Sequence, residues 1–299
     1  MSATLVLFAY ATAIGFIGPG IVKRSRWPQR APLLGAVVWQ AMTLSFSLAV
    51  MLAGYGLAMP SQHLHIVMVD LLRTCGVHGD SISAGSDRFA VAWPAVVLIA
   101  LLAGAGGRLT ASSRARARHR RALDLVGRCV PELGVTVLPY AVPAAYCLPG
   151  RRPRIVISDA ALACLRPAQL GAVLEHERAH IAGRHHLVLA VADAFRLVFR
   201  GLSLARNASQ QTALLLEMAA DDRALRTYPR HVLASAVVEL AAARTPVGSL
   251  AASGPTAVIR MRRILSPQAA PHPLLRAGLV SAAAAAPLVP LVLSCTGIG

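Results

Sequence analysis

The chain has 299 residues, of which 56% are hydrophobic and only 14% are charged, and its formal net charge is +17. Soluble domains carry about a quarter charged residues, so this composition excludes an ordinary soluble protein and indicates several membrane spans beside one modest domain. Arginine supplies nearly all of the positive charge, because Lys23 is the only lysine. The basic runs lie beside apolar segments without interleaved aromatic residues, which argues against nucleic acid as a direct partner.

Four segments are long and apolar enough to cross a lipid bilayer, which takes about 20 helical residues. They cover residues 3–22, 33–59, 90–107 and 277–295. The last segment contains Pro287 and Pro290, so we expect a kinked helix that is still embedded in lipid. The sequence thus predicts a three-span N-terminal region over 1–108, and a fourth span with a short tail over 277–299.

Loop charges predict the orientation of these spans. Four basic residues separate the first two spans, and six arginines follow the third, whereas the 60–89 loop has two arginines against three aspartates. The positive-inside rule then places the N-terminus outside and residues 109–276 in the cytoplasm. The five cysteines form no CxxC pair, which fits a reducing compartment and argues against a disulfide framework.

Residues 109–276 read as a cytoplasmic α+β domain, in which short strands precede a series of helices. The expected elements are a basic helix over 114–130, β-rich runs at 135–138, 145–148 and 154–157, and helices over 167–183, 187–205 and 210–226, with two shorter helices after Pro229. The run around 145–148 is either an edge strand that pairs with an extended substrate or an interior strand. The 187–205 helix is expected to lie in the membrane interface or to pack on the domain, with a re-entrant segment as the alternative.

The decisive motif is the run from His176 to His180, which reads HERAH. Positions i and i+4 lie on one face of a helix, so both imidazoles can bind a single zinc ion. Glu177 stands one step around the helix, where its carboxylate can take a proton from the attacking water and deliver it to the leaving amine. The motif therefore predicts a zinc metallopeptidase.

Two residues compete to be the third zinc ligand. Glu217 lies on a downstream helix with Asp221 at i+4, so one carboxylate can bind metal while the other accepts a hydrogen bond from a ligating imidazole. His186 completes a literal HExxHxxGxxH, the metzincin signature. We favour Glu217, because the residues after His186 read as a continuing apolar helix, but both ligand sets stay open.

Other polar side chains near the motif have weaker roles. His185 could donate a hydrogen bond to a developing oxyanion, although an exposed loop position is the simpler interpretation. Arg260, Arg262 and Arg263 could bind the oxyanion or a substrate carboxylate, but such basic faces more often meet anionic lipid headgroups.

The whole chain resembles the integral-membrane peptidases of the BlaR1/MecR1 type, family M56, which are related in fold to the Ste24/HtpX gluzincins. The resemblance rests on three spans, a β-rich stretch, ISDAALACL, LGAVLEHERAH, the helix from Glu217 to Asp221 and a final span. It implies a multi-span α-helical membrane protein with a small gluzincin domain. It further implies that His176, His180 and Glu217 bind zinc and that Glu177 is the general base. Asp221 would accept a hydrogen bond from a ligating imidazole.

The same resemblance implies a biological role. A multi-pass protein of the bacterial plasma membrane would cleave a protein or peptide, either a penicillinase-repressor-type transcription factor or itself, during transmembrane signalling. An SxxK motif is excluded because Lys23 is the only lysine, so we do not expect direct acylation by β-lactams. The alternative is a non-catalytic membrane signalling or scaffold protein that retains the zincin fold; the intact zinc pair and base argue against it.

Overall fold

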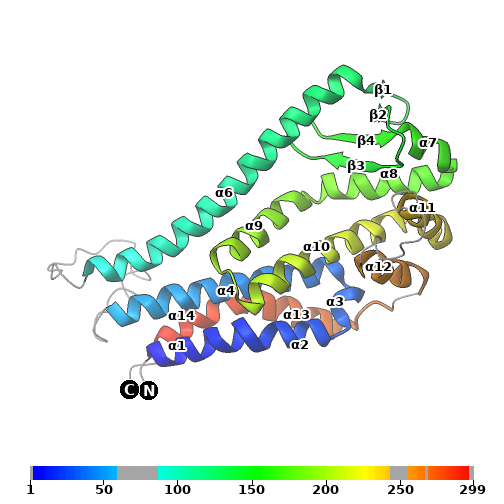
Figure 1. Ribbon diagram of the computed structural model, residues 1–299. Helices are drawn as coiled ribbons and strands as arrows, with labels where there is room; N and C mark the ends of the chain where they lie inside the picture. The colour runs from blue at the N-terminus through cyan, green and yellow to red at the C-terminus, as the bar shows by residue number, and fades with distance from the viewer. Residues whose placement is uncertain (1–2, 59–86, 243–254, 267–268, 296–299) are drawn as a thin grey trace, which may run out of the picture.

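A bundle of long helices carries a small sheet-and-helix unit at one end (Figure 1). The computed structural model describes residues 3–58, 87–242, 255–266 and 269–295. Within these residues, four helical stretches are long and apolar enough to cross a membrane, as predicted: Ala3–Arg24, Pro32–Leu57, Ala92–Val126 and Pro273–Cys295.

The first and last spans are interrupted helices, whereas the second is continuous. The first comprises α1 (Ala3–Thr12), a π-helical turn η1 (Ala13–Ile17) and α2 (Gly18–Arg24). The short α3 (Trp27–Arg30) leads into α4 (Pro32–Ala58). The last comprises α13 (Pro273–Ala285), the 3-10 turn η3 (Ala286–Leu288) and α14 (Val289–Cys295), which confirms the expected kink.

A hydrogen-bond network between spans compensates for that kink. Pro290 has no N–H, so the carbonyl of Ala286 four residues earlier lacks its α-helical donor and accepts from the Val289 N–H in the 3-10 turn instead. The Ser45 hydroxyl donates to this carbonyl at 2.6 Å, and the Tyr10 hydroxyl lies 2.7 Å from Ser45 Oγ. Three spans therefore meet at one polar point, where a freed backbone acceptor is satisfied in apolar surroundings.

The third span is part of one 40-residue helix, α6 (Asp87–Val126), which corrects the prediction of a span and a separate basic helix over 114–130. Alanine and arginine dominate residues after the span, and both favour helix. The helix ends before Gly127, where a Cβ atom would lie 2.6 Å from the Leu123 carbonyl oxygen and 2.7 Å from Thr136 Cγ2. This close approach turns residues 128–130, predicted as helix, into a strand.

The sheet has four strands in the order β1-β2-β4-β3. They are β1 (Arg128–Val130), β2 (Val135–Leu138), β3 (Ala145–Leu148) and β4 (Arg154–Ser158), so the three predicted strands are confirmed. β2 and β4 are parallel, and the other two pairs are antiparallel. Among the described residues β3 pairs only with β4, which resolves the open alternative in favour of an edge strand.

Helices α7 to α12 follow the sheet. They are α7 (Asp159–Cys164), α8 (Pro167–Ala182), α9 (His185–Val198), α10 (Ser203–Ala224), α11 (Arg230–Ala242) and α12 (Pro255–Leu265). The expected helices over 187–205 and 210–226 have different boundaries, because the chain turns at Gly201 with φ +88°. Positive φ suits glycine, which has no Cβ, and α10 starts two residues later.

The turn between α9 and α10 lies among the spans. The Phe46 ring of α4 packs edge-on against Phe195 and Phe199, with ring centroids 5.9 and 5.2 Å away. A Cβ at Gly15 would lie 3.2 Å from Leu202 Cδ1. Gly15 precedes Lys23 by eight residues, or about 12 Å of helix, so the hairpin reaches the depth of the apolar spans. This packing favours the re-entrant alternative over a helix lying on the surface.

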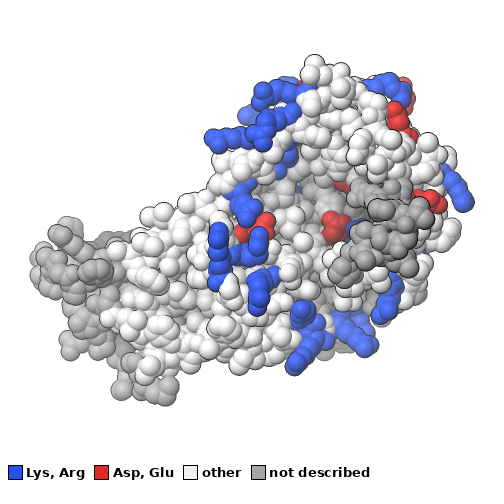
Figure 2. Space-filling view, viewed as in Figure 1, with Lys and Arg blue, Asp and Glu red and all other residues white. Residues whose placement is uncertain are grey.

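Charged side chains are unevenly distributed along the bundle. On the face drawn in Figure 2, Lys and Arg lie on the half of the molecule nearer the sheet, and the described part of the other half is uncharged. The charge asymmetry that the sequence analysis used is therefore also a spatial asymmetry.

Candidate metal centre

The HERAH motif lies on α8, which is hydrogen-bonded to α11 at its first turn. The Gln169 side chain accepts a hydrogen bond from the Arg166 N–H at 2.8 Å and donates to the Ser235 hydroxyl of α11 at 2.8 Å. These bonds fix the start of the helix, and its buried face then directs His176 toward α10. The start of α8 is thereby attached to α11.

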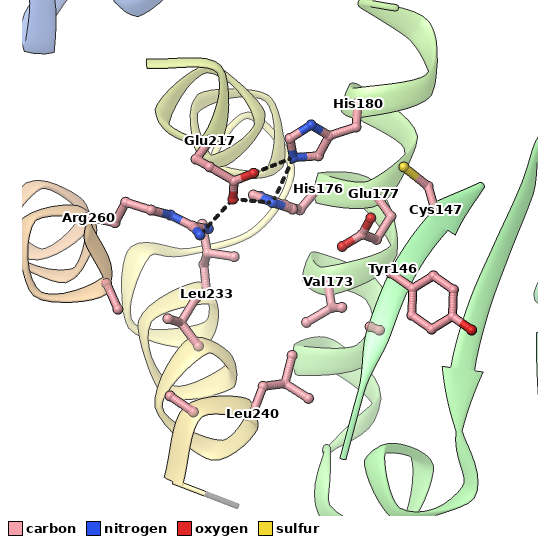
Figure 3. Close-up of a pocket in the computed structure, with 14 residues that line it drawn as sticks. Tyr146, Cys147, Val173, His176, Glu177, His180, Glu217, Leu233, Leu240 and Arg260 are labelled. Atoms are coloured by element: carbon pink, nitrogen blue, oxygen red, sulfur yellow. Dashed lines mark hydrogen bonds and ion pairs between the residues drawn. The ribbon is translucent and has the colours of Figure 1, made fainter. Parts of the chain in front are cut away.

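Three side chains converge at the contact between α8 and α10. His176 Nε2 and His180 Nε2 are 3.2 Å apart, and the Glu217 carboxylate lies 3.6 Å from the first and 3.4 Å from the second (Figure 3). Ligands at about 2.0–2.1 Å from a tetrahedral zinc ion lie about 3.3–3.4 Å from one another. The spacing and the two-imidazole, one-carboxylate donor set therefore fit zinc.

Asp221 lies behind the first imidazole. Its Oδ1 atom is 3.0 Å from His176 Nδ1, and its side chain is only 1% exposed. A carboxylate on the second ring nitrogen fixes the tautomer and orientation of a metal-binding histidine. The i, i+4 spacing predicted that Glu217 and Asp221 share a face, the family resemblance implied this role for Asp221, and the structure puts both on the α10 face that meets α8.

Arg260 joins both carboxylates, a role that sequence analysis did not assign. Its Nε and Nη2 atoms donate to Asp221 at 2.9 and 2.7 Å, and Nη1 donates to Glu217 at 2.7 Å. Its neighbours on α12 differ: Arg262 is exposed, and Arg263 donates to Asp222 and to the Gln29 carbonyl. The sequence signal for this role is the group of arginines on α12, because an arginine that becomes buried must pair with an acidic group.

His185 is buried, which corrects its interpretation as an exposed loop residue. Its Nδ1 atom lies 2.9 Å from His180 Nδ1, so it contacts the second imidazole on the side away from Glu217. The tight connection between α8 and α9 makes this possible: a Cβ at Gly183 would lie 2.4 Å from His185 Nε2, and Arg184 has a left-handed φ of 47°. The turn folds His185 back onto the site.

His186, the alternative third ligand, lies outside the cluster. The group of potential metal ligands that the structure brings together is His176, His180 and Glu217. His186 instead faces the basic side chains of Arg116 and Arg184, and burial together with these charges lowers its pKa. The same turn that brings His185 inward directs its neighbour outward.

The buried charges set the protonation of the cluster. Burial lowers the pKa of His176, but Asp221 and Glu217 outweigh it and raise this pKa to about 9. Burial lowers the pKa of His180 to about 4. Burial would raise the pKa of Glu217, yet His176 and Arg260 hold it at about 2. At neutral pH, Glu217 and His180 thus already have their metal-binding forms.

A cavity of about 530 Å³ opens beside the cluster. The Glu177 carboxylate points into it from α8, next to Cys147 of β3 (Figure 3). Burial raises the pKa of Glu177, and it raises that of Cys147 to about 12 with help from the Glu177 charge. The cavity therefore holds a carboxylate of raised basicity between the imidazole pair and an edge strand.

The edge strand is also attached to α6. His119 Nε2 lies 2.5 Å from the Tyr146 hydroxyl, and the Arg120 guanidinium donates to the carbonyls of Leu148 at 3.2 Å and Pro149 at 3.0 Å. The helix that contains the third span therefore contacts the strand that borders the cavity.

Comparison with known proteins gives one match. Residues 112–268, more than half of the chain, match the profile of Peptidase family M48, whose members are typically zinc-dependent and which is related to Ste24/HtpX. Searches of curated proteins and of solved structures found no match. The match does not confirm the resemblance to family M56, but it agrees with the expected relationship to Ste24/HtpX. This membrane-associated metallopeptidase chain belongs to peptidase family M48.

Proposed function

We propose that this protein is a zinc-dependent endopeptidase in which His176, His180 and Glu217 bind the metal and Glu177 is the general base. The convergence of the three ligand atoms is the observation that carries the proposal, because it comes from two helices far apart in sequence. Asp221 and His185 would orient the two imidazoles from behind. The family match supports the reaction class.

The residues of the site divide the chemistry of peptide hydrolysis among them. Bound zinc would polarise the scissile carbonyl and lower the pKa of a water molecule in the site. The Glu177 carboxylate accepts the proton of the attacking water and then delivers it to the leaving nitrogen. Its raised pKa suits the first half of this transfer, because a stronger base accepts the proton more readily.

Strand β3 provides a place for the substrate backbone. Its second edge is unpaired among the described residues, and Ala145, Tyr146 and Cys147 line the cavity. An extended peptide can add to such an edge through main-chain hydrogen bonds, which bind a backbone irrespective of sequence. A strand position beside the ligands also explains how a protein substrate would present one peptide bond to Glu177.

We further propose that the site faces the cytoplasm and cleaves a repressor-type protein, or the peptidase itself, in transmembrane signalling. The basic residues on the sheet-bearing half of the bundle support the orientation through the positive-inside rule. Helix α6 supports the signalling role, since it runs from the third span to contacts with β3. Both points extend the family assignment.

Co-expression in cells tests the function. Wild type and Glu177→Ala are compared by proteomics for new protein ends, with Glu175→Gln as the control on the same helix, because Glu175 pairs with Arg178 and Arg223 instead. We expect cleavage with wild type and the control and none with Glu177→Ala, while all three bind zinc. Identical protein ends in the three samples would favour the non-catalytic scaffold.

A further inference from the structure

Helix α12 has its charged and apolar side chains on unexpected sides. Arg260 and Arg263 turn inward and pair with carboxylates of α10. Val258, Ile259 and Leu265 face outward, and 60%, 37% and 56% of their respective surfaces are exposed. In an ordinary surface helix the apolar side chains face the core and the charged ones face water. Helix α12 therefore presents hydrocarbon to its surroundings, which indicates an apolar partner.

The position of α12 relates this outer face to the membrane. The Arg263 Nε atom donates to the Gln29 carbonyl at 2.6 Å, so α12 contacts α3, the connection between the first two spans (Figure 1). The last span begins at Pro273, eight residues after the end of α12 at Leu265. The segment around α3 also contains four exposed basic residues, which are Lys23, Arg24, Arg26 and Arg30. Basic residues at the ends of spans lie at the level of lipid headgroups, so α12 lies at this level too.

One basic residue belongs to the outer face of α12. Arg262 is exposed, and its position between Val258 and Leu265 gives an i, i+4, i+7 spacing. These three side chains therefore share one stripe of the helix. Helices that lie in a membrane interface combine the same two kinds of residue. Their apolar side chains enter the boundary between headgroups and acyl chains, and their basic side chains bind lipid phosphates.

We propose that the outer face of α12 is a membrane contact, and that its partner is a bilayer surface containing anionic phospholipid. Val258, Ile259 and Leu265 leave water when they enter the bilayer, which is favourable for apolar surface. Arg262 meets the phosphates at the same time. An acidic peptide would satisfy Arg262 alone and leave the apolar side chains in water, so the bilayer is the better fit. This contact goes beyond the proposed peptidase function and does not depend on it.

A fluorophore attached to single cysteines tests the contact in the full-length protein. Val258→Cys and Leu265→Cys, each in a background whose native cysteines are replaced by alanine, are labelled in nanodiscs of phosphatidylethanolamine and phosphatidylglycerol. Leu125→Cys is the matched control, because Leu125 is 86% exposed at the end of α6 remote from the third span. We expect a nitroxide near the top of the lipid acyl chains to quench the labels at 258 and 265, and not the label at 125, since an interfacial helix buries its apolar face about 5–10 Å deep.

Charge variants test the two parts of the outer face. Leu265→Glu should reduce the quenching at residue 258, because a carboxylate is repelled by anionic headgroups and loses hydration in lipid. Leu125→Glu should leave this quenching unchanged. With Arg262 present, quenching at 258 should fall when phosphatidylglycerol is omitted, and Arg262→Gln should abolish this dependence. Equal quenching in both lipids with Arg262 present would overturn the anionic-lipid assignment.

Two further outcomes would overturn the membrane contact. Quenching of the labels by a water-soluble nitroxide, and not by the lipid-borne one, would show that the outer face is hydrated. Protection from both quenchers would show that protein covers the face, either a second copy or another part of the chain. Neither outcome affects the peptidase function, which the comparison of wild type with Glu177→Ala tests separately.

Discussion

Two hydrogen bonds join Arg260 to Asp221, from Nε to Oδ2 at 2.9 Å and from Nη2 to Oδ1 at 2.7 Å. The same aspartate lies 3.0 Å from the Nδ1 atom of His176. The guanidinium therefore holds the carboxylate that orients an imidazole of the proposed metal site. A residue on α12 thus contacts the candidate metal site on α10, and its charge lies between two carboxylates, Asp221 and Glu217, that would otherwise repel each other.

Replacing Arg260 tests this positioning role. We expect Arg260→Gln to weaken zinc binding about 10- to 100-fold, because Asp221 and Glu217 both lose the donor that fixes their geometry. Competition with a zinc chelator measures the affinity. Arg262→Gln is the control, since Arg262 is exposed on the same helix. Equal affinities for the two variants would show that Arg260 does not act on the metal site.

The metal content of two variants identifies the third metal ligand. Glu217→Ala should lose zinc, because two imidazoles alone leave the site one protein ligand short. His186→Ala should retain it, since His186 lies outside the cluster. Elemental analysis of the purified variants gives the stoichiometry. Full zinc in Glu217→Ala together with none in His186→Ala would reverse the assignment and restore the metzincin-like alternative.

Zinc affinity should depend on pH through His176. Its pKa of about 9 in the metal-free protein means that the ring carries a proton at neutral pH, which the metal must displace. Affinity should therefore rise about tenfold per pH unit up to pH 9 and then level off. Asp221→Asn removes the main cause of the raised pKa and should flatten the rise. Parallel profiles for the two proteins would contradict this account.

Cys147 should react slowly with alkylating reagents. Burial beside Glu177 raises its pKa to about 12, so only about one molecule in ten thousand carries the reactive thiolate at pH 8. Cys129 and Cys164 are exposed and serve as internal references. Mass spectrometry after timed iodoacetamide treatment should show these two modified first, with the rate at Cys147 increasing about tenfold per pH unit. Equal rates at pH 8 would contradict the burial.

The bond from Ser45 to the Ala286 carbonyl should stabilise the kinked span. Ser45→Ala is expected to lower the free energy of unfolding by about 0.5–1.5 kcal/mol, because the partly buried Ala286 carbonyl loses one of its donors and keeps the Val289 N–H. Pro290→Ala restores a backbone N–H at the i+4 position, so Ser45→Ala should cost less in that background. A double-mutant cycle of thermal or denaturant unfolding measures the coupling. Additive effects would mean that the two residues do not share this carbonyl.

Local patterns in the sequence predicted much of this protein. Apolar runs predicted the four spans. Proline and glycine residues between the β-rich runs predicted β2 and β3 with their observed bounds. The spacing of His176 and His180 predicted one helix face that bears two imidazoles. The same spacing of Glu217 and Asp221 predicted another helix face that bears two carboxylates. These succeed because 1.5 Å of rise per residue and 3.6 residues per turn fix which side chains share a helix face.

Long-range packing decided what the sequence left open. Thr136 approaches Gly127 closely at the end of α6, and Gly183 with the left-handed Arg184 turns the chain so that His185, rather than His186, contacts the site. Arg260 reaches Asp221 across 39 residues. No regular spacing of residues in the sequence predicts these contacts. Each depends on how separate helices pack, and a single chain carries that information only through its tertiary structure.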